Sequence, residues 1–371
     1  MIIVIADDFT GAAEMAGISL GYGLQVALCL NKLVASDADV LILSAETRSM
    51  PKEQAVATMK EITLAARALG PAFVYKKIDS VLRGHVAAEV EAQLEVLGLK
   101  KALLLPANPS MGRTIVNGQY FVDGIALSNT GFAKDPEFAI RSSEVREIIQ
   151  RPEAAVLRAA DDLKDGLNIG ETNSFGDVER WAANMPDRCL PAGSGDFFEA
   201  LLNQRFKKKQ NQDKPRLQKP HIYISGTTYQ QSRDRMQRTV AGAAALITAN
   251  MLQRDDFSNW FDRASGMLES RQRLIIAFDD NIDTTLFDAA ALRRLMAGWM
   301  KRALENWAVK ELLIEGGATA AALFEALGQT CFEAVYEWGR GVVRMKAGEL
   351  MVTVKPGSYQ LPDALMEFYQ L

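Results

Sequence analysis

The chain has 371 residues, of which 48% are hydrophobic and 24% charged, and its formal net charge is −4 at pH 7. This length and composition predict one large domain or, preferably, two globular domains with substantial cores, and the charge gives no reason to expect a nucleic-acid partner. Cys29, Cys189 and Cys331 show no CxxC spacing, and His85 and His221 are the only histidines. A His-based zinc site or a Ser-His-Asp triad is therefore not expected.

The sequence predicts a cytoplasmic protein without a membrane-spanning segment. No stretch reaches membrane-spanning length, and the apolar run Met1–Ala6 is too short for a signal peptide and lacks basic flanks. Widely separated cysteines suit reduced thiols in the core.

The run Met1–Ala6 leads directly into Asp7, Asp8, Thr10 and Gly11. This pattern predicts a buried strand that ends in a tight turn with two carboxylates, where open α/β sheets bind ligands. Adjacent acids at such a turn can bind hydroxyls, accept a proton or hold a metal. Alternatively, the Asp or Thr only caps the next helix. Taken alone, the stretch leaves both interpretations open.

Short apolar runs alternate with helical patterns through the first half of the chain. This alternation predicts a parallel sheet with helices packed on it. A short hairpin is expected at 117–127, where the sequence reads NGQYFVDGIAL. The predicted strands are Met1–Ala6, Val40–Ser44, Phe73–Ile78 and Ala102–Leu105, and a helix is predicted over Lys52–Leu69.

The segment Tyr75–Gly98 combines a strand, a polar turn and an amphipathic helix that ends at Gly98. The turn carries Lys76, Lys77, Asp79, Ser80 and Arg83. A helix N-terminus and three cations favour an anion, and Asp79 and Ser80 could bind hydroxyls, so this turn suits a small hydroxylated acid. The alternative is a helix capped by Asp79 or Ser80, with the lysines in solvent.

Arg48 follows the predicted strand Val40–Ser44 and should lie near the same carboxyl edge. Arginine can grip a carboxylate through two hydrogen bonds, although a lone arginine in such a place is usually a surface residue. Gly112, Arg113 and Thr114 form a candidate further polar loop. His85 is expected in the first helical turn rather than in catalysis.

A basic segment separates the two halves of the chain. Residues 205–220 read RFKKKQNQDKPRLQKP, with seven basic residues, one acid and two prolines. We interpret it as a linker rather than a functional basic patch. The predicted domains are residues 1–206 and 221–371, joined by 207–220. Strands of the second half are predicted at His221–Ile224, Leu274–Phe278, Glu311–Ile314 and Leu350–Val354.

Three glycine turns follow strands of the second half. Paired glycines, hydroxyls and helix N–H groups can surround a phosphate, although each turn alone is weak evidence and none is a GxxxxGK[ST] or GxGxxG motif. With acids and cations in the first half, the arrangement suits phosphate transfer from a nucleotide to a hydroxy acid across a domain cleft. The turns are Ser225-Gly226-Thr227-Thr228, Gly316-Gly317-Ala318-Thr319 and Gly357-Ser358.

The chain resembles the four-carbon acid sugar kinase family over nearly its whole length. The resemblance is carried by ADDFTGA (6–12), KKIDSVLRG (76–84), GRTIVNGQY (112–120), ISGT (224–227) and GGAT (316–319), in this order. It implies an α/β fold of two domains, each a mostly parallel sheet flanked by helices, with the active site in the cleft between them. The N-terminal domain would bind the sugar acid and the C-terminal domain ATP.

The resemblance also implies site residues and an activity. The chain would be an ATP-dependent kinase, with Mg²⁺ on the phosphates, that phosphorylates the terminal hydroxyl of threonate, erythronate or an oxo-tetronate. Asp8, or else Asp79, would orient or deprotonate this hydroxyl. The substrate-binding residues would be Asp7, Asp8, Arg48, Lys77, Asp79, Ser80 and Arg83. The ATP-binding residues would be Ser225, Gly226, Gly316, Gly317, Ala318, Thr319, Gly357 and Ser358.

The chain departs from the family pattern in the second half. It is short for the family, its last loop reads KPGSYQLPD, and Ala318 stands where the family usually has an acidic or polar residue. These departures motivate an alternative, a non-catalytic sensor that binds a sugar acid or a nucleotide. A phosphatase with Asp7 as nucleophile would need Asp-x-Asp-x-Thr, whereas these acids are adjacent. A homodimer is a reasonable expectation.

Overall fold

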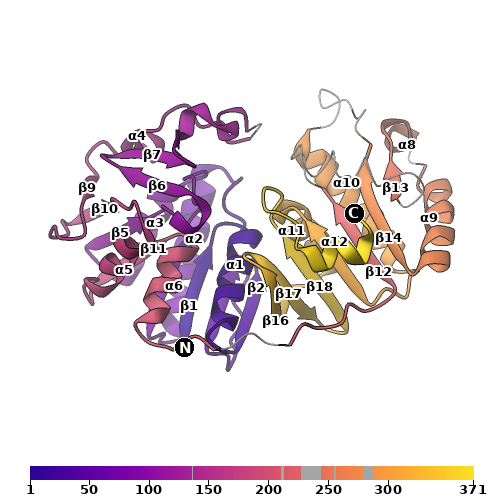
Figure 1. Ribbon diagram of the computed structural model, residues 1–371, viewed down its shortest axis with the longest axis horizontal. Coiled ribbons are helices and arrows are strands. Elements are labelled where there is room, and N and C mark those ends of the chain that lie inside the picture. Colours follow the sequence, from indigo (N-terminus) through magenta and orange to yellow (C-terminus); the bar gives the residue numbers. More distant parts are fainter. Residues whose placement is uncertain (136, 210–212, 227–243, 255, 280–281, 283–287) are drawn as a thin grey trace. The chain divides into compact units, whose positions relative to one another are not determined.

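The computed structural model describes residues 1–371 except 136, 210–212, 227–243, 255, 280–281 and 283–287. The chain divides into two compact units, Met1–Gln210 and Asn211–Leu371, and this division falls within the segment 207–220. Figure 1 labels many of the helices and strands of both units. In the described part of the chain, no helix is long and apolar enough to cross a membrane.

The first unit is built on a sheet in the order β2-β3-β1-β4-β11-β5-β10-β9, in which all neighbours are parallel. Its strands are β1 (Ile2–Ala6), β2 (Val26–Leu30), β3 (Val40–Ser44), β4 (Phe73–Lys77), β5 (Lys101–Leu105), β9 (Ala155–Leu157), β10 (Gly166–Gly170) and β11 (Cys189–Gly193). Its helices are α1 (Phe9–Leu20), α2 (Lys52–Ala68), α3 (Val86–Leu97), α4 (Val145–Ile148), α5 (Phe175–Ala183) and α6 (Gly195–Asn203).

Helices cover both faces of this sheet. The chain moves one way across the sheet from β1 to β2 and the other way from β3 to β4. Right-handed crossovers therefore place α1 on one face and α2 on the other. Helix α2 packs against α3, with Met59 and Ile62 against Ile3 and Ile5 of β1, while α6 packs against α1 and α5. The predicted strands and the helix of this half are confirmed.

The parallel register brings several loops to one edge of the sheet. Ala6, the last residue of β1, lies beside Ser44 of β3 and Lys77 of β4, and Lys77 lies beside Gly193 of β11. The chain segments after these strands are therefore neighbours at the carboxyl edge, where α/β sheets place their ligand sites.

A small antiparallel sheet packs beside α3. It contains β6 (Arg113–Val116), β7 (Gln119–Val122) and β8 (Ile125–Ala126). The strands β7 and β8 confirm the predicted hairpin, and β6 extends it. Ile115 and Tyr120 are fully buried in one core cluster with Val90 of α3 and Leu104 of β5. This packing fixes the small sheet against the main one.

The second unit has a mixed sheet in the order β13-β14-β12-β15-β18-β17-β16. The strands from β13 to β18 in this order are parallel, and β17 is antiparallel to both of its neighbours. The strands are β12 (His221–Ser225), β13 (Ala244–Ile247), β14 (Arg273–Phe278), β15 (Glu311–Glu315), β16 (Cys331–Gly339), β17 (Val342–Ala347) and β18 (Leu350–Lys355). The helices are α8 (Ala249–Arg254), α9 (Phe257–Arg271), α10 (Ala289–Leu304), α11 (Gly317–Leu327) and α12 (Asp363–Tyr369).

The predicted strands of this half are confirmed as β12, β14, β15 and β18. The antiparallel strands β16 and β17 were not predicted. Helix α12 covers a core cluster in which Leu365 and Tyr369 pack with Tyr223, Ile275 and Leu313. This cluster includes residues of β12 and β15, whose carboxyl ends carry two of the glycine turns.

Candidate functional site

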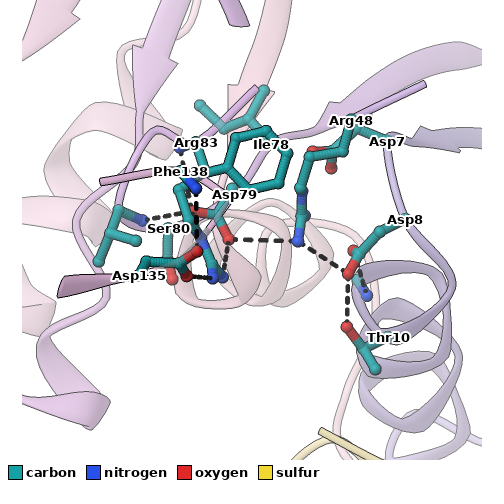
Figure 2. Close-up of polar contacts among 12 residues, drawn as sticks. Asp7, Asp8, Thr10, Arg48, Ile78, Asp79, Ser80, Arg83, Asp135 and Phe138 are labelled. Atoms are coloured by element: carbon teal, nitrogen blue, oxygen red, sulfur yellow. Dashed lines mark hydrogen bonds and ion pairs between the residues drawn. The ribbon is translucent and has the colours of Figure 1, made fainter. Parts of the chain in front are cut away.

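The first polar site lies at the carboxyl edge of the first unit, after β1, β3 and β4. Figure 2 shows that Asp7 and Asp8, Arg48 and the turn around Asp79 lie close together there. Asp7 and Asp79 are buried, at 4% and 5% exposed, whereas Asp8 and Arg48 are half-buried. The structure thus brings together residues that the sequence places more than 70 positions apart, as the sequence predicts.

Asp8 is the N-cap residue of α1, so the helix-cap interpretation is confirmed for this residue. Its Oδ1 accepts a hydrogen bond from the Gly11 amide at 2.9 Å, and its Oδ2 accepts one from the Thr10 hydroxyl at 2.6 Å. The cap fixes the orientation of the carboxylate at the end of β1. Capping and ligand binding are thus compatible at this position.

Arg48 connects the three carboxylates of the site. Its Nε donates to Asp7 Oδ2 at 2.7 Å, and its Nη1 lies 2.9 Å from Asp8 Oδ2 and 3.6 Å from Asp79 Oδ1. Asp7 Oδ1 is buried and has no hydrogen-bond partner among the described residues. The arginine is therefore not a lone surface residue, and its charge balances buried acids.

Two of the acids beside Arg48, Asp8 and Asp79, are held in the ionised form. Burial opposes ionisation of Asp8, but Arg48, the Thr10 hydrogen bond and Lys77 outweigh it and lower the pKa of Asp8. Burial likewise opposes ionisation of Asp79, but Arg83 and Arg48 hold its pKa well below the ordinary value. Both groups are anionic acceptors at neutral pH.

Asp79 organises the turn after β4. Its Oδ2 accepts from the amides of Val81 and Arg83, at 3.2 and 3.1 Å, and the Arg83 guanidinium donates to both of its oxygens at 3.0 and 2.8 Å. Helix α3 begins only at Val86, with His85 as its N-cap residue. The alternative of Asp79 or Ser80 as helix cap is therefore wrong, because the carboxylate closes its own turn instead.

Lys77 and Lys76 point to opposite sides of the sheet, as neighbours in a strand do. Lys77 Nζ donates to the Ile78 carbonyl at 2.8 Å, lies 3.6 Å from a Glu14 oxygen, and contributes to the lowered pKa of Asp8. Lys76 Nζ instead lies 2.7 Å from Glu89 in the core. Lys77 therefore lies at the carboxyl edge, whereas the expectation that Lys76 adds a cation to the turn is wrong, because its side chain is buried in the core.

Several residues of this site were not predicted. Asp135 pairs with Arg83 at 3.0 Å across 52 residues of sequence, and no local pattern could have indicated this contact. Arg113 contacts the Ser80 hydroxyl, and the Tyr120 hydroxyl donates to the Ser80 carbonyl. The sequence indicated a polar loop at Gly112-Arg113-Thr114, but it did not indicate that Arg113 contacts Ser80, which lies 33 positions upstream.

Glu46 is a further acid that was not predicted at this edge. It follows β3 in a left-handed conformation with φ of 50°, and its carboxyl accepts a hydrogen bond from the Ser44 hydroxyl. Burial raises its pKa to about 8, and the charges of Asp8 and Asp7 act in the same direction. Glu46 is therefore protonated at neutral pH, unlike the acids that Arg48 holds.

A second polar site lies at the carboxyl edge of the second unit. Ser225, Glu315 and Lys355 lie side by side at the ends of β12, β15 and β18. The three glycine turns begin directly after these residues, so the structure brings Gly226, Gly316–Thr319 and Gly357-Ser358 together. Thr227 and Thr228 of the first turn lie outside the described residues.

A buried charge pair lies beneath the glycine turns. Lys355 Nζ is 2.6 Å from Glu315 Oε1, and both side chains are fully buried. Glu315 Oε2 accepts from the hydroxyls of Tyr223 at 2.7 Å and Ser225 at 3.0 Å. Lys355 also donates to the carbonyl of Pro356 at 2.8 Å. These bonds fix the ends of all three strands relative to one another.

Two of the turns require glycine, at Gly316 and at Gly226. Gly316 has φ of 103°, which disfavours side chains, and it precedes α11 without a side-chain cap. A Cβ at Gly226 would lie 2.1 Å from Thr319 Oγ1. The backbone amides at the start of α11 are thus available to an anion such as a phosphate. In the described ranges, no group of three or more His, Cys, Asp or Glu side chains could hold a metal ion.

The fold and these two edges define an α/β protein with a polar site in each of its two units. Residues 2–178 match the family model of sugar-binding N-terminal domains. The chain is 27% identical to the D-threonate kinase of Salmonella typhimurium (strain LT2), over 88% of this chain and 86% of the relative. The resemblance to four-carbon acid sugar kinases is confirmed.

Further similarities agree with this assignment. The 3-oxo-tetronate kinase of Brucella melitensis biotype 1 is 36% identical over 155 residues, which cover 40% of this chain and 35% of the relative. The crystal structure of a protein from Salmonella typhimurium LT2, described as a putative tRNA synthase, superposes with a TM-score of 0.80 at 20% identity, over 97% of this chain and 96% of that one. This likeness confirms the α/β fold.

Proposed function

We propose that the protein is an ATP-dependent kinase that phosphorylates the terminal hydroxyl of a four-carbon sugar acid, of the threonate, erythronate or oxo-tetronate type. The observation that carries the proposal is the convergence of Asp7, Asp8, Arg48 and Asp79 at one buried edge of a sugar-binding domain. The kinase names of relatives aligned along most of the chain support the reaction.

In this proposal, the first unit binds the sugar acid. Ionised Asp8 and Asp79 accept hydrogen bonds from substrate hydroxyls, and Asp8 orients the attacking one. A lowered pKa makes Asp8 a weak base, which suits phosphoryl transfer, since this reaction depends on positioning and charge neutralisation more than on early deprotonation. Arg48 keeps both acids in place. Lys77, Ser80 and Arg83 line the same site.

The second unit binds ATP in this proposal. The uncapped start of α11 and the turn at Gly316 and Gly317 suit the phosphates, and the turns at Ser225 and Gly357 complete the site. Mg²⁺ would arrive on the ATP phosphates and neutralise their charge. Three further points stay predictions: the two sites meet across a cleft, the protein is a homodimer, and it is cytoplasmic.

The test is to incubate the protein with Mg·ATP and a panel of four-carbon acids and to measure ADP formation. We expect turnover on at least one threonate, erythronate or oxo-tetronate isomer and none on the corresponding neutral alditols. ADP formation on no acid of the panel would contradict the proposal. The alternative of a non-catalytic sensor is not favoured by the relatives, and it predicts tight acid binding in calorimetry without turnover.

A further inference from the structure

Arg113 is a buried arginine without a carboxylate partner in the part of the chain that the structure describes. The residue is 8% exposed, and its Nε has no hydrogen-bond partner among the described residues. By contrast, Arg48 is within 4 Å of three carboxylates, and Arg83 pairs with two. Across the described ranges of the chain, Arg113 forms no ion pair with Asp or Glu.

Arg113 lies beside the sugar-acid site. It is the first residue of β6, and its backbone exchanges hydrogen bonds with Asn108 at 2.9 and 3.1 Å, which fix its position. Its Nη1 contacts the hydroxyl of Ser80, in the turn that Asp79 organises. The Phe132 ring lies 5.8 Å from its guanidinium and 5.7 Å from that of Arg83. These contacts place its charge next to the predicted substrate residues.

A buried guanidinium without an anion is costly, and the cost falls when a ligand supplies the missing charge. The planar guanidinium matches a carboxylate, which it can bind through two parallel hydrogen bonds. Arg48 and Arg83 could bind the same carboxylate only by weakening the ion pairs that they already make. Of these three arginines, Arg113 is therefore the one that can pair with a new anion at the lowest cost.

We propose that Arg113 binds the carboxylate of the sugar acid, with the Ser80 hydroxyl beside it. This inference rests on the proposed function for the identity of the ligand. It assigns Arg48 and Arg83 to holding the aspartates and Arg113 to anchoring the acid end of the substrate. The hydroxyl end is then left to Asp8 and Asp79.

The test is isothermal calorimetry without ATP, using D-threonate and D-erythronate as probes for wild type, Arg113→Met and Arg113→Lys. We expect Arg113→Met to weaken acid binding about 100-fold, since a lost charge-assisted pair is worth about 3 kcal/mol. Arg113→Lys should retain part of the affinity. As matched control, Arg158→Met removes an exposed arginine that is 3.5 Å from Glu171, and it should bind as wild type does.

Thermal unfolding separates a binding role from a structural one. Because Arg113→Met removes an unbalanced buried charge, the variant without ligand should be at least as stable as wild type. A large loss of stability in Arg113→Met with unchanged acid affinity would overturn the proposal. It would also be overturned if the wild-type protein bound neither acid, or if it bound inorganic phosphate more tightly than the two acids. Acid binding that depends on Arg113 without any turnover would support this inference and contradict the proposed kinase activity.

Discussion

Arg48 Nη1 lies 2.9 Å from Asp8 Oδ2, the same oxygen that accepts the Thr10 hydrogen bond. The Asp8 carboxylate thus caps α1, pairs with a half-buried arginine and faces the carboxyl edge of the sheet. Its oxygens are fixed in position, and its pKa is lowered. This geometry gives Asp8 the properties of a fixed anionic acceptor for a substrate hydroxyl.

Asp8→Asn should abolish most of the activity with little loss of stability. Asparagine still caps a helix, so α1 is retained, but the neutral amide cannot orient a hydroxyl as the carboxylate does. We expect kcat to fall about 100-fold or more while ATP affinity stays unchanged, as measured by steady-state kinetics and nucleotide titration.

Asp288→Asn provides the control for this change. Asp288 also caps a helix, α10, through a hydrogen bond from the Ala291 amide, but it lies in the other unit and in no proposed site. It should leave kcat at the wild-type value. A fully active Asp8→Asn variant would refute the role given to Asp8.

Glu46 predicts a specific pH dependence of stability. Its pKa in the folded protein is about 8, against an ordinary value of 4.5, so the folded state keeps a proton that the unfolded chain loses. Between these two values stability must fall as pH rises, by at most about 1.4 kcal/mol per pH unit from this group, and outside them the group contributes no slope.

The comparison of wild type with Glu46→Gln isolates this effect. Glutamine does not ionise, so the variant should gain stability relative to wild type as the pH rises from 5 to about 8, with no further gain above. The measurement is urea unfolding at a series of pH values. A stability difference that is independent of pH would show that Glu46 titrates normally.

Lys355→Met should destabilise the protein by about 3 kcal/mol, since it leaves Glu315 as a buried charge without its cation. The double variant with Glu315→Gln should recover part of this loss. The control is Lys60→Met, which breaks a pair with Glu95 of similar length, 2.6 Å, on the surface, and it should cost at most about 1 kcal/mol. Equal losses in urea unfolding for the buried and the exposed lysine would contradict this account of the pair.

Gly226→Ala should disturb the proposed ATP site. Its Cβ would lie 2.1 Å from Thr319 Oγ1 and 2.9 Å from Thr319 Cβ, so the start of α11 must shift. We expect about a tenfold loss of ATP affinity and a destabilisation of about 1–3 kcal/mol. Gly298→Ala in α10, where a new Cβ meets nothing within 4 Å, should be neutral or stabilising. If Gly226→Ala had unchanged nucleotide affinity, the close packing of Gly226 against Thr319 would not be required for ATP binding.

Local patterns in the sequence were sufficient for much of the fold. Apolar runs such as 40–44 predicted their strands because buried parallel strands have few polar positions. Strand β11 was not predicted, since Pro191 and Gly193 interrupt its apolar pattern and its neighbours β4 and β5 stabilise it. The strands β16 and β17 form a hairpin around Arg340 and Gly341, a short-range signal that the prediction did not use.

The candidate site was predictable where its parts follow strand ends. Asp8, Arg48 and Asp79 each lie within four residues of the end of a predicted strand, and parallel register brings such positions together. The contacts of Asp135 with Arg83 and of Arg113 with Ser80 depend on how a long excursion packs back onto the sheet. No short-range pattern encodes such contacts, and only the structure shows which arginines are already balanced by acids.

The most direct test of the central claim is ³¹P NMR of the reaction with Mg·ATP and the acid that gives the fastest ADP formation. The account predicts a new phosphomonoester signal, split into a triplet by the two protons of a terminal methylene group, that grows with ADP. ADP together with inorganic phosphate alone, or a phosphomonoester signal split by a single proton, would contradict phosphorylation of the terminal hydroxyl.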